Sequence, residues 1–294
     1  MTLTALKHWL MAFRPKTLTA AVAPVLMGTA MAYGDGLEHF PTAALCLLAA
    51  LTIQVGTNIA NDYYDFKKGA DTSERIGPTR VTQAGLIAPG AVRNAFIMTF
   101  AVSFLACAAL AYRGGWPIIV LSIVSIISGI LYTAGPKPLG YIGLGDVFVL
   151  IFFGPVALAA TYYLQSYELN SAVVIAGLGP GLISMAILTV NNYRDIDSDA
   201  KNGKKTLAVR FGRTFAQLEY MACLLLAALL PVLIYIFIED HKHILWASLS
   251  ALLAIPGIHA ITTSTDGKVL NQLLGYTGKI LLVYSVTFSI GWIL

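Results

Sequence analysis

The sequence predicts an all-α protein that crosses a membrane many times. Of its 294 residues, 57% are hydrophobic and only 12% are charged, whereas a soluble domain averages about 25% charged residues. The mean hydropathy is +0.74. Apolar runs of roughly 20 residues, the length that spans a bilayer as a helix, recur along the whole chain. The connections between them are mostly short, so we interpret residues 1–294 as one transmembrane domain.

Nine such runs are predicted to be transmembrane helices. They cover residues 17–34, 41–64, 91–112, 116–133, 146–164, 172–190, 215–238, 244–263 and 272–293. The first could be taken for a signal peptide, because Ala30-Met31-Ala32 imitates a cleavage site. Its length and the later spans favour a retained helix. The cysteines lack the spacing of metal ligands and are interpreted as packing residues within spans: Cys46, Cys107 and Cys223.

The placement of positive charge predicts the orientation. If the N-terminus is cytoplasmic and the spans alternate, every Lys and Arg lies on the cytoplasmic side except Arg113, Lys242 and Lys279. This bias favours a cytoplasmic N-terminus and an external C-terminus. The net charge of +4 therefore reflects topology. Nucleic-acid binding is not expected, since the basic residues lie in loops between spans.

Two clusters of Asn and Asp mark the cytoplasmic ends of the second and sixth spans. The first contains Asn58, Asn61, Asp62, Asp65 and Asp71, and the second contains Asn191, Asn192, Asp195, Asp197 and Asp199. Carboxylates near a bilayer are costly and indicate function, and Mg²⁺ commonly binds between a few carboxylates and the phosphates of a substrate. A polar, basic loop with glycine follows each cluster. This similarity predicts two weak pseudo-repeats, spans one to four and five to eight, followed by span nine.

Helix geometry predicts that the two clusters form one site. At about 100° per residue, the first four residues of the first cluster fall within roughly 100° of arc. In the second cluster all members except Asp197 keep to one side, since positions three and four apart are neighbours. Asp197 is expected to face solvent or to cap a helix. A solvated helix end explains any single Asp equally well, but it does not explain two clusters at matching depth.

The cytoplasmic loops supply the opposite charge, which suits phosphate oxygens. The cations are Arg75, Arg80, Lys137, Lys201, Lys204 and Lys205. Topology alone also explains each lysine. Arg80 differs because it lies among polar and Gly residues and away from a span edge. Asp146, at the start of the fifth span, is interpreted mainly as a helix N-cap.

These motifs resemble those of the UbiA superfamily of intramembrane prenyltransferases, and most closely its branch that prenylates 1,4-dihydroxy-2-naphthoate in menaquinone synthesis. The resemblance covers nearly the whole chain, although the last three spans carry little diagnostic sequence. The acidic motifs specify only the superfamily, whereas Asn58, the stretch 75–83 and Asn191-Asn192 indicate the naphthoate branch. The residues that carry the resemblance are Arg14 to Leu18, Asn58 to Asp65 with Gly69 and Asp71, Arg75 to Gln83, Tyr141 to Asp146, and Asn191 to Leu207.

The resemblance implies nine helices around a central cavity open toward the cytoplasmic side, in the plasma (inner) membrane of a bacterium. It implies an enzyme that transfers a polyprenyl group from polyprenyl diphosphate to 1,4-dihydroxy-2-naphthoate, with loss of CO₂ and diphosphate, giving a demethylmenaquinone. Mg²⁺ assists ionisation of the allylic diphosphate, and the prenyl tail leaves sideways into membrane lipid.

Mapped onto this chain, the resemblance also implies which residues act. The catalytic carboxylates are Asp62, Asp65, Asp195 and Asp199, and these bind Mg²⁺ together with Asn58 and Asn192. The candidates for diphosphate contact are Arg80, Lys137, Arg194 and Lys204. The loops 66–89 and 196–210 are hypothetical lids.

Several alternatives stay open at this point. The same fold acts on other acceptors, such as 4-hydroxybenzoate, homogentisate or a haem precursor. A cation transporter would use the Asp residues as its ion site, but such sites typically lie near the bilayer midplane on broken helices. The clusters here lie at span ends beside basic loops. A non-catalytic lipid-binding scaffold does not explain metal-type spacing in both halves.

Overall fold

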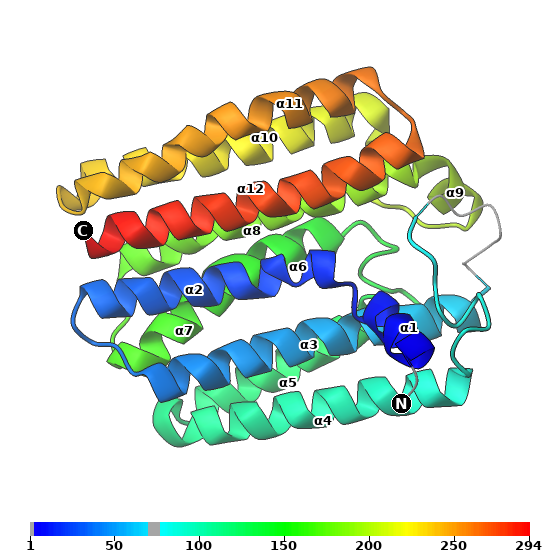
Figure 1. Cartoon of the computed structure of the whole chain (residues 1–294), viewed down its shortest axis with the longest axis horizontal. Helices are drawn as coiled ribbons and strands as arrows, with labels where there is room; N and C mark the ends of the chain where they lie inside the picture. Colours follow the sequence, from blue (N-terminus) through cyan, green and yellow to red (C-terminus); the bar gives the residue numbers. More distant parts are fainter. Residues whose placement is uncertain (1–2, 70–76) are drawn as a thin grey trace.

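The structure of the chain is a computed structural model that describes residues 3–69 and 77–294, and the regular structure in these ranges is helical. The long helices run roughly side by side, and the short α1 lies across them (Figure 1). The helices are α1 (Leu3–Phe13), η1 (Pro15–Thr17), α2 (Thr19–Gly34), α3 (Phe40–Lys67), α4 (Pro89–Gly114), α5 (Trp116–Leu131), α6 (Gly145–Ile151), η2 (Phe152–Val156), α7 (Ala157–Ser166), α8 (Ser171–Arg194), α9 (Ile196–Lys201), α10 (Leu207–Ile238), η3 (Lys242–Leu249), α11 (Ser250–Thr263) and α12 (Gly267–Ile293).

Each of the nine predicted spans falls on helical structure, which confirms the all-α prediction. The predicted number of crossings is not confirmed. In the described ranges, seven helical segments are each long and apolar enough to cross a membrane, and the α1–η1 and α2 pair, bent by 53°, makes an eighth. Helix α5 has 16 residues, or about 24 Å at 1.5 Å per residue, which is shorter than the roughly 30 Å of a bilayer core.

The predicted fifth span is one helix broken by a π-helical turn. Pro155 has no N–H to donate, and Gly154 leaves the helical region with φ −125° and ψ −113°. The break is packed closely against α8. A Cβ atom added at Gly177 would lie 2.5 Å from the Cα atom of Pro155. Glycine on α8 therefore lets the two backbones touch, as small residues do between membrane helices.

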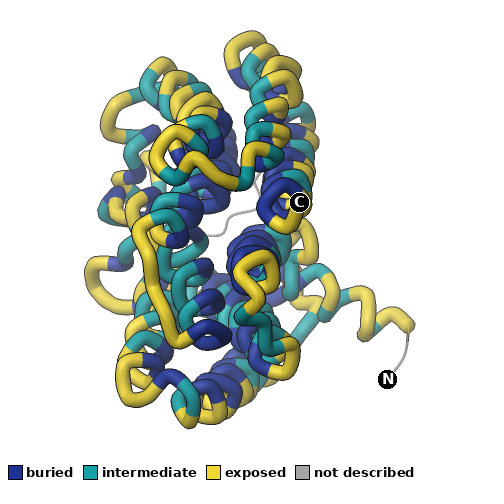
Figure 2. The backbone as a smooth tube through the Cα atoms, turned by 90° about the vertical axis from the view of Figure 1, so that its left-hand side faces the viewer, coloured by how far each residue is buried: buried dark blue, intermediate teal, exposed yellow. Residues whose placement is uncertain are grey.

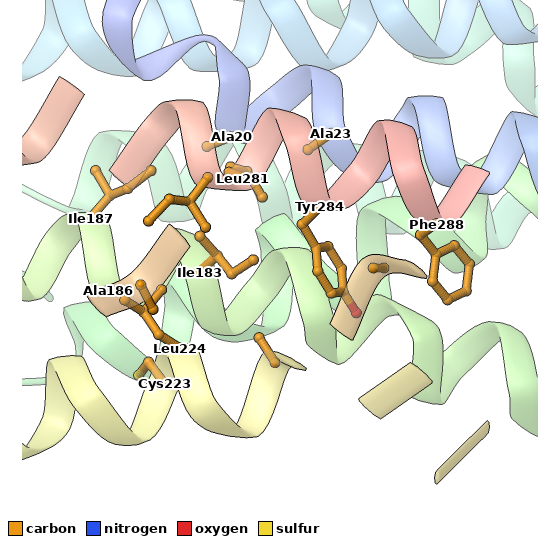
Figure 3. Close-up of a cluster of buried hydrophobic side chains, with 14 of the residues drawn as sticks. Ala20, Ala23, Ile183, Ala186, Ile187, Cys223, Leu224, Leu281, Tyr284 and Phe288 are labelled. Carbon is orange, nitrogen blue, oxygen red and sulfur yellow. The ribbon is translucent and has the colours of Figure 1, made fainter. Parts of the chain in front are cut away.

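The largest hydrophobic core lies between α2, α8, α10 and α12. Figure 3 shows Ala20 and Ala23 of α2 beside Leu281 of α12, with Ile183 of α8 nearby. Buried residues face the middle of the bundle, and exposed residues cover its ends and outer sides (Figure 2). This distribution leaves many large apolar side chains on the outer faces, as expected of helices that face lipid.

The C-terminal ends of α3 and α8 lie at the same end of the bundle, beside α9 (Figure 1). The chain ends at the opposite end. The fold therefore brings the ends of the second and sixth predicted spans together, while the pseudo-repeat stays a prediction.

Candidate functional site: a long cavity with one charged end

A cavity of about 370 Å³ runs through the bundle between α2, α3, α5, α7 and α8. Its lining follows α3 from Cys46 to Asp65, a length of roughly 28 Å at the helical rise of 1.5 Å per residue. Most of the wall consists of apolar side chains such as Leu110, Ile118 and Phe152. The charged residues gather at the end marked by Asp65. The cavity therefore offers a long apolar shaft with a polar head.

Most of the predicted site residues line this cavity. They are Asn58, Asp65, Arg80, Asn192, Asp195, Asp199 and Lys204. The described lining does not contain Asp62, Lys137 or Arg194. Asp71 and Arg75 lie outside the described residues.

Asp65, near the end of α3, is 1% exposed and is held by two different segments. Its Oδ2 accepts a hydrogen bond from Nη2 of Arg80 at 2.8 Å, which is also an ion pair. Its Oδ1 accepts one from the Tyr141 hydroxyl at 2.9 Å. A buried carboxylate requires such partners, because burial without them costs several kcal/mol. Arg80 and Tyr141 thus fix Asp65 at the cavity wall.

Asp62 occupies a different position from the one its place in the cluster suggested. Its two carboxylate oxygens each accept a backbone N–H at 3.0 Å, from Val81 and from Thr82. The side chain that lines the cavity beside Asp65 is Asn61, whose Oδ1 accepts a hydrogen bond from the Thr133 hydroxyl at 2.9 Å. The geometry makes Asp62 an anchor for the segment 77–88, while its predicted role as a metal ligand stays a prediction.

Asn58 joins α3 to the turn that precedes α2. Its Nδ2 donates to the Phe13 carbonyl and to the Thr17 hydroxyl, both at 3.0 Å. With the nitrogen engaged in this way, the side-chain oxygen is the atom that Asn58 offers to a ligand.

The second cluster is organised by Arg194. Its guanidinium makes a bidentate pair with Asp195, at 2.8 Å to Oδ1 and 2.6 Å to Oδ2. It also donates to Asn191 and to Asn271 of α12, both at 2.7 Å. Arg194 is 4% exposed and acts here as the holder of Asp195 and the two Asn side chains.

Asp199 lies on α9 and forms an ion pair with Lys204 at 3.2 Å. Asp197 points outward as predicted, because its side chain is 82% exposed and pairs with Arg213 at 2.6 Å. Lys137 is exposed. The helical projection therefore separated Asp199 from Asp197 correctly.

Tyr141 and Lys68 are site residues that the sequence analysis did not single out. The ammonium groups of Lys68 and Lys204 lie 4.8 Å and 4.9 Å from the centre of the Tyr141 ring, within cation–π range. Lys68 also donates to the carbonyls of Thr133 and Gly135 at 2.7 Å and 3.0 Å. Burial lowers the pKa of Lys68 below its ordinary value; Asp65 opposes this shift and Lys204 adds to it. Apart from the motif around Tyr141, no signal in the sequence placed these groups together.

The donor atoms at the polar head suit a hard cation. They are carboxylate and amide oxygens: Asn58, Asn61, Asp65, Asn191, Asn192, Asp195 and Asp199. In residues 3–69 and 77–294, no three His, Cys, Asp or Glu side chains come together as a self-sufficient metal site. Mg²⁺ needs only one or two carboxylates when phosphates and water complete its shell. The residues present therefore fit Mg²⁺ that binds together with a phosphate group.

The chain is similar to proteins of one family along nearly its whole length. The UbiA prenyltransferase family matches residues 21–283. A protein of Haemophilus influenzae named 1,4-dihydroxy-2-naphthoate octaprenyltransferase is 38% identical, over 97% of this chain and 96% of its own. A protein of Escherichia coli with the same name is 38% identical, over 96% and 94%. The solved structure of a UbiA homolog from Archaeoglobus fulgidus bound to GPP and Mg²⁺ has the same fold, with a TM-score of 0.72, 18% identity, and coverage of 97% of this chain and 99% of that chain.

Proposed function

This chain belongs to the UbiA prenyltransferase family, and we propose that it transfers a polyprenyl group from polyprenyl diphosphate to 1,4-dihydroxy-2-naphthoate. CO₂ and diphosphate are lost, and the product is the quinol form of a demethylmenaquinone. The observation that carries the proposal is the match over nearly the whole chain to relatives named for this reaction. The cavity supports it, because a charged head and a long apolar shaft fit a diphosphate with a prenyl chain.

Mg²⁺ is the implied cofactor, and the cavity-lining members of the predicted set would hold it. These are Asp65, Asp195 and Asp199, with the side-chain oxygens of Asn58 and Asn192; we add Asn61 and assign Asp62 a supporting role. When bound, Mg²⁺ neutralises the negative charge that grows on the departing diphosphate.

The cations at the polar head bind the diphosphate. Arg80 and Lys204 line the cavity and pair with Asp65 and Asp199 in the structure. We assign them to phosphate oxygens in the complex, an exchange of partners that keeps every buried charge compensated. Lys68, held beside Tyr141, supplies a third positive charge at this end. Arg194 keeps Asp195 oriented, and Lys137 is exposed on the loop.

The reaction needs no nucleophile from the protein. The allylic C–O bond breaks and its electron pair leaves with the diphosphate, whose charge the cations at the head stabilise. The ring carbon that bears the carboxylate then bonds to the allylic carbon. The bond between the ring and the carboxylate breaks, its electrons restore the aromatic ring, and CO₂ departs. The apolar wall of the shaft keeps water from the cation.

The chain is an integral membrane protein by its apolar helices. We propose that it lies in a bacterial inner membrane with the charged head and N-terminus on the cytoplasmic side and the C-terminus outside. Supporting this, Lys and Arg concentrate in the predicted cytoplasmic segments. Of the proposed lids, 66–89 and 196–210, the described parts 66–69, 77–89 and 196–210 flank the head, and residues 70–76 lie outside the described residues.

The test is prenyl transfer by purified protein in detergent, with 1,4-dihydroxy-2-naphthoate, a polyprenyl diphosphate, and either Mg²⁺ or EDTA. The expected result is Mg²⁺-dependent formation of the demethylmenaquinol, detected as the demethylmenaquinone that it gives on oxidation in air, with release of CO₂. Mg²⁺-dependent diphosphate release without this product would move the proposal to another aromatic acceptor. Folded protein with no turnover of either kind would favour the cation transporter.

A further inference from the structure

Helix α1 carries an exposed apolar stripe on its outer face. Leu3 is 87% exposed, Leu6 46% and Leu10 47%. At about 100° per residue, these three side chains lie within roughly 60° of arc. The opposite face is occupied, because Ala12 is buried in a cluster with residues of α3 and α4, and Trp9 packs against this cluster. Figure 2 shows the N-terminal segment extending outward from the bundle. Helix α1 is therefore apolar on the side that faces the protein and also on the side that faces away from it.

The contact of α1 with α3 places it at one surface of the bilayer. The carbonyl of Phe13, the last residue of α1, accepts a hydrogen bond from Nδ2 of Asn58 at 3.0 Å. Asn58 follows Phe40, the first residue of α3, by 18 residues, or roughly 27 Å at 1.5 Å per residue. A hydrocarbon core is roughly 30 Å thick. A bilayer that begins at Phe40, next to the polar residues Asp35 and His39, therefore has its other surface at α1. Here the axis of α1 and η1 departs from that of α2 by 53°.

The charged side chains around the stripe are basic. Lys7 is exposed beside the leucines, and Lys16 is exposed shortly after α1. The first acidic residue of the chain is Asp35, which follows the far end of α2. Arg93 of α4 is also exposed and follows Val92, a member of the buried cluster against which α1 packs. Leucine side chains with Lys and Arg beside them are typical of a helix that lies on a bilayer containing anionic lipids.

The stripe also adjoins an apolar surface of α4. Ile97 and Met98 are 53% and 69% exposed, and they directly follow Phe96, which is buried in the same cluster as Ala12. Lipid that covers this part of α4 therefore extends to α1. A second copy of the chain fits less well, because a two-fold contact through the stripe would bring the Lys7 side chains of both copies close together.

We infer that α1 is an in-plane anchor that binds an anionic phospholipid surface, with the leucine stripe among the acyl chains and Lys7 and Lys16 at the lipid phosphates. The inference goes beyond the proposed function and does not depend on the reaction. Because Phe13 is tied to Asn58, which lines the cavity, the anchor fixes the depth of the cavity in the membrane. The polar head then lies at the level of the lipid headgroups, and the apolar shaft lies among the acyl chains.

The test places an environment-sensitive fluorophore on α1 of the full-length protein, in lipid nanodiscs that hold one copy. The native cysteines are buried, so a cysteine introduced by Leu6→Cys or Leu10→Cys is labelled selectively, and wild-type protein gives the background. Met98→Cys is the lipid-facing reference, and Lys137→Cys, on an exposed loop, is the aqueous reference. Quenching by iodide in water and by brominated acyl chains is measured in phosphatidylcholine alone and in an equal mixture with phosphatidylglycerol.

We expect labels at Leu6 and Leu10 to behave like the label at Met98, quenched by brominated lipid and protected from iodide. Lys7→Gln should lower the ratio of immersed to exposed α1 about fivefold in discs with phosphatidylglycerol, the contribution of one basic residue near an anionic surface, and should have little effect in phosphatidylcholine alone. The matched control, Lys137→Gln, should change neither. Labels on α1 that iodide quenches as strongly as the label at Lys137, protection that requires two copies in a disc, or an effect of Lys7→Gln that is equal in both lipids would each overturn the assignment.

Discussion

Replacing Asp62 distinguishes two roles that a carboxylate in an acidic cluster can have: it can bind the metal, or it can hold a neighbouring segment in place. The carboxylate is 2% exposed, and its oxygens accept the backbone N–H groups of Val81 and Thr82 at 3.0 Å. Arg80 directly precedes Val81 in the chain and pairs with Asp65. Asp62 therefore fixes the segment that delivers Arg80 to the cavity. Replacing it should loosen that segment first and affect binding only as a consequence.

The size of the effect follows from the hydrogen bonds. Asp62→Asn keeps one acceptor oxygen and turns an NH₂ group toward the other N–H. One charge-assisted hydrogen bond is lost, and two buried donors, the backbone N–H and the new NH₂ group, face each other without an acceptor; together these cost at least about 2–4 kcal/mol. Because both hydrogen bonds hold one segment, this cost appears as easier local opening more than as global unfolding.

Two measurements test these consequences. Hydrogen exchange of peptides that cover 77–88 reports how easily the segment opens, and calorimetry with a prenyl diphosphate and Mg²⁺ reports the binding affinity. Asp62→Asn should speed exchange in this segment and weaken binding moderately. The comparison variant, Asp65→Asn, alters a carboxylate that lines the cavity and should abolish Mg²⁺-dependent binding. If Asp62→Asn abolished that binding while exchange stayed unchanged, Asp62 would be a metal ligand and our interpretation would be wrong.

Three further predictions follow from the structure. Tyr141→Phe removes the hydroxyl that donates to Asp65 at 2.9 Å and should lower kcat/KM for the prenyl diphosphate about five- to thirtyfold, equivalent to about 1–2 kcal/mol; unchanged kinetics would contradict this. Gly177→Ala places a methyl group 2.5 Å from the Cα atom of Pro155 and should lower the thermal midpoint, whereas Gly90→Ala, which meets nothing within 4 Å, should not. Mg²⁺ and the prenyl diphosphate should each raise the affinity of the protein for the other by about tenfold or more. Titrations of each ligand with and without the other measure this effect, and equal affinities in the two titrations would contradict it.

The helices were predictable because hydropathy acts over whole segments. A run of about 20 apolar residues has few alternatives in a bilayer, and each predicted span is helical in the structure. The interruptions depend on tertiary contacts instead. The π-helical turn at Gly154 packs against Gly177 of α8, a residue that is distant in sequence. Hydropathy likewise gave α5 the same weight as the other spans, although the helix ends after 16 residues.

The sequence predicted which face of each helix contributes to the site, but not which individual residue on that face meets the cavity. Asp65, Asp195 and Asp199 line the cavity as expected. Neighbouring residues on a helix differ by about 100°, so an arc of that width admits both Asn61 and Asp62, and only packing decides which of them meets the cavity. Contacts from loops have no periodicity at all, which is why the position of Tyr141 had no counterpart in the helical projection.

The arrangement of charge at the polar head explains why a metal and a diphosphate would bind together. Each cavity carboxylate has a cation partner in the structure: Asp65 with Arg80, Asp195 with Arg194, and Asp199 with Lys204. Burial of an unpaired charge is costly. A metal ion alone would take the carboxylates and leave the basic side chains unpaired, and a diphosphate alone would take the basic side chains and leave the carboxylates unpaired. A metal and a diphosphate that arrive together compensate Asp65 and Asp199 as well as Arg80 and Lys204, while Arg194 keeps Asp195 oriented. On this reasoning, the ion pairs hold the ligand-free cavity in a stable state, and they make binding selective for a metal–diphosphate pair over either component.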